Sequence, residues 1–305
     1  MELRHLRYFI AVAEELNFTR AARRVGIGQP PLSNQIRDLE NEIGTALFRR
    51  LPNGAELTEA GKAFLPEVRA ILFQAEQAKR SAIRAARGES GRLRVGFTSS
   101  AVFNPLVPAA VNAFREKYAD VEFSLEEAPT TRLLEQLDVE ELDAVFVRPG
   151  SGDQMKARCH LLAEERMVIA LPSRDPRSEA EALRLDEVAE ESFVLFPREA
   201  GTGFFDDIIA ACRQAGFEPI LGQLAPQITS IPSLIAVGLG VSIVPAEMVK
   251  INVPGVRYIA IEGEAPKARL TLATRRDERS PIVRNFLTQA LGVKPSLASQ
   301  GQFGE

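Results

Sequence analysis

The chain has 305 residues, of which 45% are hydrophobic and 26% charged, a composition typical of a globular protein with room for two or three domains. It holds no apolar run near the roughly 18 residues of a membrane span and no apolar signal-peptide stretch, so we expect a cytoplasmic protein without membrane contact. The formal net charge is -4, but residues 1–87 carry 14 Lys and Arg against 10 Asp and Glu, which makes the beginning basic and the remainder acidic.

The first 28 residues predict two amphipathic helices and a tight turn. The apolar side of the first helix is formed by Leu6, Phe9, Ile10, Ala13 and Leu16. The apolar side of the second is formed by Ala21, Ala22 and Val25. Thr19 is the expected cap of the second helix, because its hydroxyl can accept from free backbone N–H groups. Gly26 and Gly28 then allow a sharp turn.

A third helix is predicted to begin at Gln29, Pro30 and Pro31, since proline's fixed φ and missing N–H cost nothing in a first turn. Its inward side chains, at helical spacing, are Leu32, Ile36, Leu39 and Ile43. The face left outward carries Gln29, Ser33, Asn34 and Arg37. Gln and Asn can pair with adenine, Arg with guanine, and a serine hydroxyl with a base or a phosphate. An ordinary solvated helix face is the alternative interpretation.

Residues 46–58 predict a β-hairpin, with strands over 46–51 and 55–58 around the turn at Pro52 and Asn53. Arg49 and Arg50 lie where such a wing can meet phosphates. Three helices and a wing make a winged helix-turn-helix domain over residues 1–58, for which double-stranded DNA is the expected partner. The candidate DNA-contacting residues are Thr19, Arg20, Gln29, Pro30, Pro31, Ser33, Asn34, Arg37, Arg49, Arg50 and Asn53. A head domain that mediates protein contacts remains an alternative.

This segment resembles the DNA-binding domain of the LysR-type transcriptional regulators. The resemblance is carried by residues 1–9, 18–22, 29–33, 39–40, 44, 47–48 and 57–61. It implies that the residues at 29, 30, 31, 33 and 34 read or position DNA, and that Thr19 and the wing hold phosphates. The chain departs from the family's pattern at two places: Gly28 stands where a capping Ser is common, and Asn53 stands where many relatives carry Arg.

Residues 59–87 predict one long helix, followed by a polar hinge over 88–91. Spacings of four and three define a seam of Phe64, Val68, Ile71, Ala75, Ala78 and Ala82. Pro66 is expected to kink the helix or mark a boundary. Packing on its own domain is one interpretation of the seam. The resemblance instead implies a dimerisation helix with an antiparallel mate, a homotetramer on DNA, and RNA polymerase as a further partner.

From residue 92 the pattern changes to α/β. Strands are predicted over 93–97, 121–126 and 143–147, with helices over 102–118 and 130–140 between them, which indicates a parallel sheet. A second set has strands over 167–171, 193–196 and 241–244 and helices over 204–215 and 231–239. A strand over 269–273 and a helix over 281–291 return to the first set. Two lobes follow, one from 92–161 and 267–305, the other from 162–266. The family's effector domain has this periplasmic-binding-protein-like architecture.

Ligands of open parallel sheets bind beyond the carboxyl ends of strands, beside helix amino termini. Three such corners carry suitable side chains, and a cation follows the third strand. The candidate effector-binding residues are Thr98, Ser99, Ser100, Thr130, Thr131, Arg148, Gly201, Thr202, Gly203, Phe204 and Phe205. The resemblance implies effector contacts at such positions in its aromatic-catabolism branch. We therefore expect a small anionic effector, for which the phenylalanines would suit a planar ring; helix capping without a ligand is the alternative.

Enzyme functions are disfavoured by composition. His5 and His160 are the only histidines, too few for an obvious triad or metal cluster, and neither a dinucleotide fingerprint nor a phosphate loop is present. We expect no catalytic residues, no metal and no cofactor. Cys159 and Cys212 leave a thiol-based redox sensor as an alternative, although they stand far apart and Cys212 lies in an apolar stretch.

Overall fold

The computed structural model describes residues 1–150 and 156–293, and the chain divides into two compact units, Met1–Arg84 and Ala85–Glu305. We call the first the winged unit and the second the two-lobed unit. Across the described residues, every helix is too short or too polar to cross a membrane.

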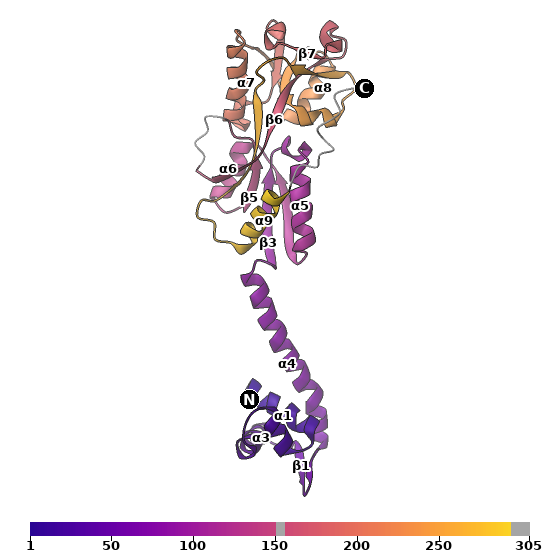
Figure 1. Ribbon diagram of the computed structural model, residues 1–305, viewed down its shortest axis with the longest axis vertical. Helices are drawn as coiled ribbons and strands as arrows, with labels where there is room; N and C mark the ends of the chain where they lie inside the picture. Colours follow the sequence, from indigo (N-terminus) through magenta and orange to yellow (C-terminus); the bar gives the residue numbers. More distant parts are fainter. Residues whose placement is uncertain (151–155, 294–305) are drawn as a thin grey trace. The chain divides into compact units, whose positions relative to one another are not determined.

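The winged unit packs three short helices against a hairpin and the start of a long helix (Figure 1). Its elements are α1 Leu3–Glu15, α2 Phe18–Arg24, α3 Gln29–Ile43, β1 Phe48–Leu51, β2 Gly54–Leu57 and α4 Glu59–Ala86. Phe9 lies at the centre of the core, with its ring centroid 5.2 Å from those of both Phe48 and Phe64. This core therefore joins α1, the wing and α4 through aromatic contacts.

Three local expectations for the winged unit are wrong. Leu16, assigned to the apolar side of the first helix, is 48% exposed, because α1 ends at Glu15 and Leu16 forms its left-handed C-cap. Asn17, not Thr19, caps α2, because the Asn17 side chain accepts from the backbone N–H groups of Thr19 and Arg20, both at 3.0 Å. Ile43 is exposed, since α3 ends at Gly44 before its last turn reaches the core. The inward stripe of α3 therefore stops at Leu39, which is fully buried.

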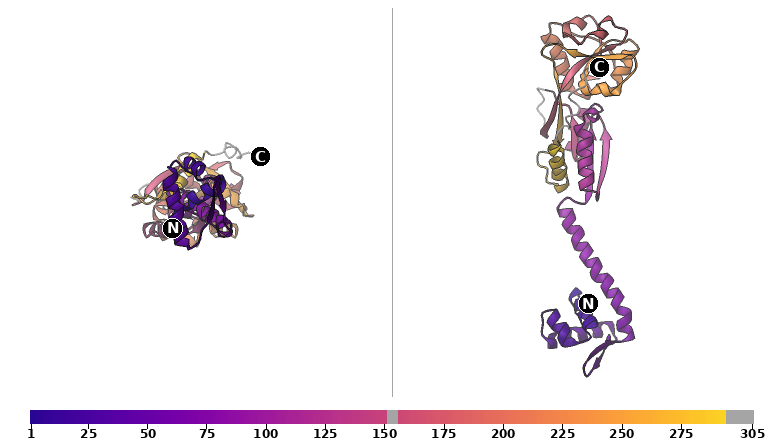
Figure 2. Two further views of the ribbon diagram at one scale, coloured as in Figure 1. Left: turned by 90° about the horizontal axis from the view of Figure 1, so that it is seen from below. Right: turned by 45° about the vertical axis from the view of Figure 1, so that its right-hand side comes forward.

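Helix α4 runs without interruption across Pro66, so this proline does not mark a boundary (Figures 1 and 2). The first part of the predicted dimerisation seam belongs to the unit's own core, where Val68 is fully buried and Phe64 contacts Phe9. Ala75 is partly buried, while Ile71, Ala78 and Ala82 are exposed. The first part of α4 therefore packs in the core of the winged unit, and the later part of the predicted seam is mostly exposed.

The predicted polar hinge is attached to the two-lobed unit. The Asn285 side-chain amide donates to the carbonyl oxygens of Arg87 and Gly88 at 2.9 and 3.1 Å. Gly88 has a φ of +68°, and a Cβ there would lie 2.5 Å from the backbone nitrogen of Ile282. Gly91 already begins the first strand. Hydrogen bonds and close packing therefore fix this segment to the two-lobed unit, and it is not a free hinge.

The two-lobed unit is built on one eight-stranded mixed sheet with a small two-stranded sheet beside it. The strands are β3 Gly91–Phe97, β4 Val121–Glu127, β5 Ala144–Val147, β6 Arg158–Pro172, β7 Ala182–Leu183, β8 Ser192–Leu195, β9 Ile220–Leu224, β10 Ser242–Pro245, β11 Val256–Ile261 and β12 Lys267–Thr274. The helices are α5 Leu106–Lys117, α6 Thr130–Asp138, α7 Thr202–Gln214, α8 Ile231–Ala236 and α9 Pro281–Gly292. Short 3-10 segments are η1 Ala101–Phe103, η2 Pro176–Glu179, η3 Leu185–Val188, η4 Arg198–Ala200, η5 Ile228–Ser230 and η6 Ala246–Ile251.

In lobe I, β4, β3 and β5 are parallel, as predicted, and helices cover both faces of the sheet (Figure 1). Phe146 packs with α5 and α9 on one face, while its neighbours Val145 and Val147 pack with α6 on the other. The predicted helix over 102–118 begins only at Leu106, because the chain first makes the 3-10 turn η1.

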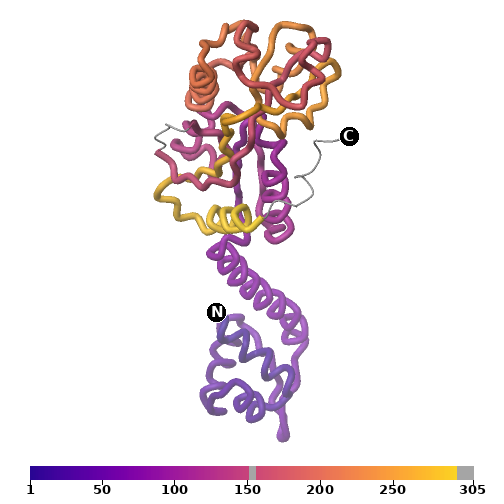
Figure 3. Tube along the Cα trace, turned by 45° about the horizontal axis from the view of Figure 1, so that its top comes forward, coloured from indigo at the N-terminus to yellow at the C-terminus, as the bar shows by residue number. Residues whose placement is uncertain are grey.

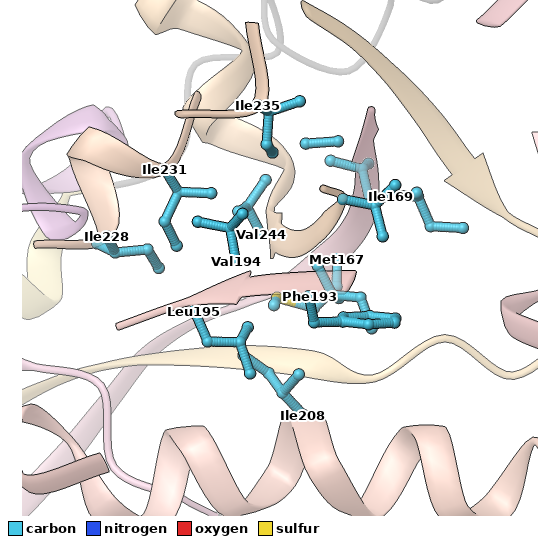
Figure 4. Packing of buried hydrophobic residues seen from close by; sticks show 14 of the residues in the cluster. Met167, Ile169, Phe193, Val194, Leu195, Ile208, Ile228, Ile231, Ile235 and Val244 are labelled. Carbon is cyan, nitrogen blue, oxygen red and sulfur yellow. The ribbon is translucent and has the colours of Figure 1, made fainter. Parts of the chain in front are cut away.

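Lobe II contains strands that the sequence pattern did not predict, namely β7, β9 and β11. In β8, Val194 lies with Val244 and Ile231 on one side, and Leu195 lies with Ile208 of α7 on the other (Figure 4). An isolated parallel β-bridge between Phe193 and Val241, the residue before β10, connects this small sheet to the larger one.

Two long strands carry the chain between the lobes (Figure 3). The first part of β6 pairs with β12, and the second part pairs with β10 and β11, all antiparallel. The predicted lobe boundary at 161/162 therefore falls inside β6, and the boundary at 266/267 falls where β12 begins. A purely parallel sheet does not describe this unit. Residues 294–305, assigned above to lobe I, lie outside the described residues.

Candidate functional site

The outer face of α3 presents most of the predicted reading residues. Pro30, Pro31, Asn34 and Arg37 are exposed, and Gln29 is partly exposed. Gly28 precedes the helix without a side-chain cap, and Pro30 and Pro31 occupy its first turn. These side chains lie on one helix face and are available to a major groove.

Ser33 differs from these neighbours because it is buried, with 6% of its surface exposed. The guanidinium of Arg50, on β1, donates to the Ser33 hydroxyl. The expectation that Ser33 faces outward is therefore wrong: the wing covers it.

Two other arginines that were predicted to contact DNA have carboxylate partners. Arg20 lies 3.4 Å from the Glu15 carboxylate, and Arg49 pairs with Glu56 across the hairpin at 2.7 Å. Both pairs are exposed, so their charges are screened and their attraction is weak. Asn53 lies in the exposed turn between β1 and β2, and Thr19 is exposed near the start of α2.

Glu40 positions the wing, a role that the sequence reasoning missed. Its carboxylate accepts from the backbone N–H groups of Leu47 and Phe48 at 2.8 and 3.0 Å. Two acids, Asp38 and Glu40, flank the core residue Leu39, and the sequence does not show which of them meets the wing. The contact forms because the chain turns at Gly44, which brings the backbone of Leu47 and Phe48 back beside α3.

In the two-lobed unit a cavity lies between the lobes and encloses about 530 Å³ including its open mouth. We call it the interlobe cavity. Its lining includes seven predicted residues: Thr98, Ser99, Ser100, Thr130, Arg148, Gly201 and Phe204. The further lining residues, which the sequence reasoning missed, are Glu127, Ala128, Pro129, Phe196, Ala200, Pro226, Gln227 and Ile228.

Four predicted effector residues do not line this cavity. Thr131, Thr202 and Gly203 line a neighbouring hollow beside Arg275 and Asp277. Phe205 is buried in the lobe II core, with its ring edge against Phe196 at a centroid distance of 6.0 Å. Helical geometry accounts for the difference, because consecutive residues of α7 point in directions about 100° apart.

Arg148 is buried on the floor of the interlobe cavity, with 2% of its surface exposed. Its Nε donates to the Ser100 hydroxyl and its Nη2 to Glu165, both at 2.8 Å. The Glu165 carboxylate also accepts from the Asn104 amide at 2.8 Å. The cation predicted for the effector is thus already neutralised by a carboxylate from β6, which sequence reasoning missed.

Two buried donors at the cavity lack a protein partner. They are Nη1 of Arg148 and the Thr98 hydroxyl, and neither has a hydrogen-bond acceptor among the described residues. An unsatisfied buried donor costs free energy, so both favour an acceptor bound in the cavity. Helices α6 and α7 also begin at this cavity, at Thr130 and next to Gly201, without side-chain caps.

Apart from Glu127 and Gln227, the remaining lining side chains are apolar. Phe196 and Phe204 stack with ring centroids 5.7 Å apart and planes 15° apart. A third ring between them would need about 7 Å, twice the contact distance of carbon atoms. The two phenylalanines therefore form a single wall against which a small apolar group can lie.

Cys159 is exposed and Cys212 is buried, and neither has the lowered thiol pKa of a reactive cysteine. Burial raises the pKa of Cys212 to about 11 and also raises the pKa of the Cys159 thiol, which the charge of Arg276 lowers only in part. Both thiols are therefore mainly protonated near neutral pH, and the thiolate is the reactive form. The geometry gives the redox alternative no support. No group of three or more metal-ligating side chains occurs in the described parts of the chain.

Comparison with known proteins decides the family. Residues 3–62 match the family described as bacterial regulatory helix-turn-helix protein, lysR family, and residues 86–294 match the LysR substrate binding domain. The chain belongs to the LysR family of bacterial transcriptional regulators. The HTH-type transcriptional regulator BudR of Raoultella terrigena is 40% identical over 94% of this chain and 99% of its own length.

Solved LysR-family structures agree with the fold. The crystal structure of CbnR, a LysR family transcriptional regulator, gives a TM-score of 0.82 at 30% identity and covers 95% of this chain and 100% of CbnR. Full-length CbnR in complex with its target DNA gives 0.80 at 29% identity, over 95% of this chain and 98% of that one. The protein is therefore a DNA-binding transcriptional regulator with an effector-binding domain, and not an enzyme.

Proposed function

We propose that the effector is a small carboxylate that binds in the interlobe cavity. The observation that carries this proposal is the pair of unpartnered buried donors, Arg148 Nη1 and the Thr98 hydroxyl. A carboxylate has two oxygens and accepts from both donor types at once. The uncapped starts of α6 and α7 add favourable partial positive charge.

The charges around the cavity favour one carboxylate over two. Glu165 offsets the charge of Arg148 at 2.8 Å, and Glu127 stands on the cavity lining. A second carboxylate would meet Glu127 without a second free cation among the described lining residues. The rest of the ligand would lie against the wall of Phe196 and Phe204. We infer a monocarboxylate with a small apolar body, for which a single aromatic ring is the upper end of the size range.

Binding of such a ligand would be coupled to the arrangement of the lobes. Thr98 and Arg148 belong to lobe I, while Gly201 and Phe204 belong to lobe II. Around the cavity the lobes already touch: the Thr131 hydroxyl donates to the Glu199 carbonyl at 2.8 Å, and Lys250 donates to the Phe103 carbonyl at 3.0 Å. A ligand that contacts both lobes stabilises this arrangement over others, which is the thermodynamic basis of an effector response.

Calorimetric titration of the full-length protein with acetate, benzoate and succinate tests the proposal. We expect binding of a monocarboxylate, with succinate weaker. Thr98→Val removes one donor without changing shape and should weaken binding about tenfold. Thr288→Val is the matched control, because the Thr288 hydroxyl donates to the Arg284 carbonyl within α9, away from the cavity lining and from the interlobe contacts. Absence of binding by every acid, or equal losses in the two variants, would contradict the site.

For the winged unit we propose that Gln29, Asn34 and Arg37 read base edges while Pro30 and Pro31 contact thymine methyl groups. Their shared exposed face on α3 supports this assignment. Thr19 and the wing are proposed to approach the phosphates. Contact with RNA polymerase stays a prediction of the family resemblance.

We also propose that α4 forms a homodimer through the surface beyond its own core, and that dimers pair into tetramers on DNA. Ile71, Phe73 and Ile83 are 39%, 60% and 41% exposed. These large apolar side chains in water favour a partner surface that covers them. Phe73 and Ile83 were not part of the predicted seam. Phe64 and Val68 were part of it, but they pack in the winged unit's own core. Sedimentation analysis of the Phe73→Glu variant should show that the dimer dissociates. A variant with the same mass in solution as the wild type would contradict this dimerisation surface.

A further inference from the structure

The wing residue Arg50 connects three elements of the winged unit. It lies on β1, its guanidinium donates to the hydroxyl of Ser33 on α3, and its Cζ atom lies 4.7 Å from the ring centroid of Phe18 at the start of α2. Phe18 is itself supported by the ring of Phe48, at a centroid distance of 5.9 Å. The guanidinium is therefore held over a buried aromatic face, a favourable position for a planar cation.

Arg50 differs from its neighbours in its charge environment. Arg20 and Arg49 have the carboxylates of Glu15 and Glu56 beside them. Within the winged unit, all of whose residues are described, no acidic side chain pairs with Arg50. Its partners are a hydroxyl and an aromatic ring, which leave its positive charge uncompensated. An oriented, uncompensated guanidinium is suited to an anion such as phosphate.

The bond to Ser33 leaves donors free on both residues. Arginine has five N–H groups, of which Ser33 receives one, and the serine hydroxyl that accepts this bond still has its own proton to donate. Only 6% of the Ser33 surface is exposed and its hydroxyl is bonded to Arg50, whereas the neighbouring residue Asn34 is exposed. The available chemistry of Ser33 is therefore directed to whatever Arg50 binds.

We propose that Ser33 and Arg50 form one composite phosphate-binding site, with Phe18 as its support. The inference rests on the DNA-facing role proposed above for α3 and the wing. One phosphate oxygen would accept from the Arg50 guanidinium and another from the Ser33 hydroxyl. The site positions the recognition helix against the DNA backbone and carries no sequence information of its own. Ser33 thereby leaves the set of base-reading residues.

The test uses full-length protein and a duplex that the wild type selects from a random pool, with a scrambled duplex beside it. Fluorescence anisotropy is measured over a series of salt concentrations. Arg50→Ala should lower affinity about tenfold on both duplexes and reduce the salt slope by about one, the signature of a lost phosphate contact. Arg69→Ala is the control and should change affinity much less, because Arg69 lies on α4, outside the predicted DNA-contacting residues, and pairs with Glu14 at 3.1 Å.

Two further variants separate a composite site from independent contacts. In the Ser33→Ala, Arg50→Ala double variant, the loss should be close to that of Arg50→Ala alone. Arg50→Lys keeps the charge but lacks the planar fork, so it should lose most of the same affinity. Wild-type affinity in Arg50→Lys, multiplied losses in the double variant, or a changed selected sequence in Ser33→Ala would each overturn the proposal.

Thermal unfolding of each variant shows whether the winged unit is intact, and Phe18→Leu adds a test that leaves both polar groups in place. This variant should reduce affinity on both duplexes alike, because Arg50 loses its aromatic support. An unaffected affinity in folded Phe18→Leu would remove Phe18 from the site. A wild type that selects no sequence at all would instead contradict the DNA-facing role of the winged unit, so the two failures are distinguishable.

Discussion

Arg50 in the winged unit and Arg148 in the two-lobed unit each donate to a serine hydroxyl, but their surroundings are opposite. Arg148 is buried, with Glu165 at 2.8 Å, while Arg50 is exposed and stacks on Phe18 without a carboxylate partner. A buried cation without a counter-charge would be very costly, so the cavity contains a nearly neutral pair. On the surface no such constraint applies, and the charge stays available to a polyanion.

The difference indicates how each site selects its ligand. DNA is attracted by uncompensated charge, and its binding depends steeply on salt. The interlobe cavity offers oriented donors with little net charge, so it selects by hydrogen-bond geometry and shape. Three predictions test this difference between the two arginines.

The largest effect is expected at Glu165. Glu165→Leu leaves Arg148 buried without its carboxylate and removes the acceptor of Asn104. We expect the free energy of unfolding of the two-lobed unit to fall by about 3 kcal/mol. Differential scanning calorimetry measures the change.

Glu165→Gln is the control for this prediction, since it keeps an acceptor oxygen and loses only the charge. It should destabilise the unit less than Glu165→Leu. Equal stability of Glu165→Leu and the wild type would show that Arg148 tolerates burial alone, and the contrast with Arg50 would disappear.

An intermediate effect is expected at Asp175, whose partner Arg177 lies between the two extremes in exposure. A hydrogen bond from Arg177 lowers the pKa of Asp175 below its usual value. A carboxyl group with a lowered folded pKa stabilises the fold above its unfolded pKa of about 4, and this contribution is lost as the pH falls through the folded value. Asp175→Asn should therefore cost about 1 kcal/mol at pH 7 and progressively less below about pH 4.

Denaturant titrations of wild type and Asp175→Asn at several pH values check this dependence. A difference between the two proteins that stays constant down to the lowest pH would mean that the side chain acts only as a turn cap, because Asp175 also accepts from the Arg177 backbone N–H at 2.8 Å.

The smallest effect is expected at the exposed pair of Arg49 and Glu56. Glu56→Gln should change the free energy of unfolding by less than about 0.5 kcal/mol, since solvent screens the pair. The same variant releases Arg49 from its carboxylate and should slightly strengthen DNA binding at low salt. A stability loss as large as that of Glu165→Leu would show that burial does not determine how much each arginine–carboxylate pair contributes to stability.

Much of the local structure could be predicted from the sequence. The spacing of Leu32, Ile36 and Leu39 placed α3 and its buried face, and the polar corners at Thr98, Thr130 and Gly201 indicated where a cavity would lie. These features follow from backbone periodicity and from strand and helix ends, which involve residues close together in the chain.

The remaining features involve partners distant in sequence. Whether Ser33 is free or covered depends on a wing 17 positions further on, and whether Arg148 is a free cation depends on Glu165 in the next strand. Likewise, β12 exchanges hydrogen bonds with the first part of β6 although roughly 100 residues separate the two, and no local pattern encodes such pairing.

The sequence alone thus determined the family, the recognition helix and the places where polar side chains gather at strand ends, because each is encoded in short-range spacing. Tertiary structure decided which of those side chains are available. Burial and pairing bring groups from separate elements within 3 Å of one another, and at that distance a carboxylate or hydroxyl from elsewhere in the chain sets what an arginine can bind.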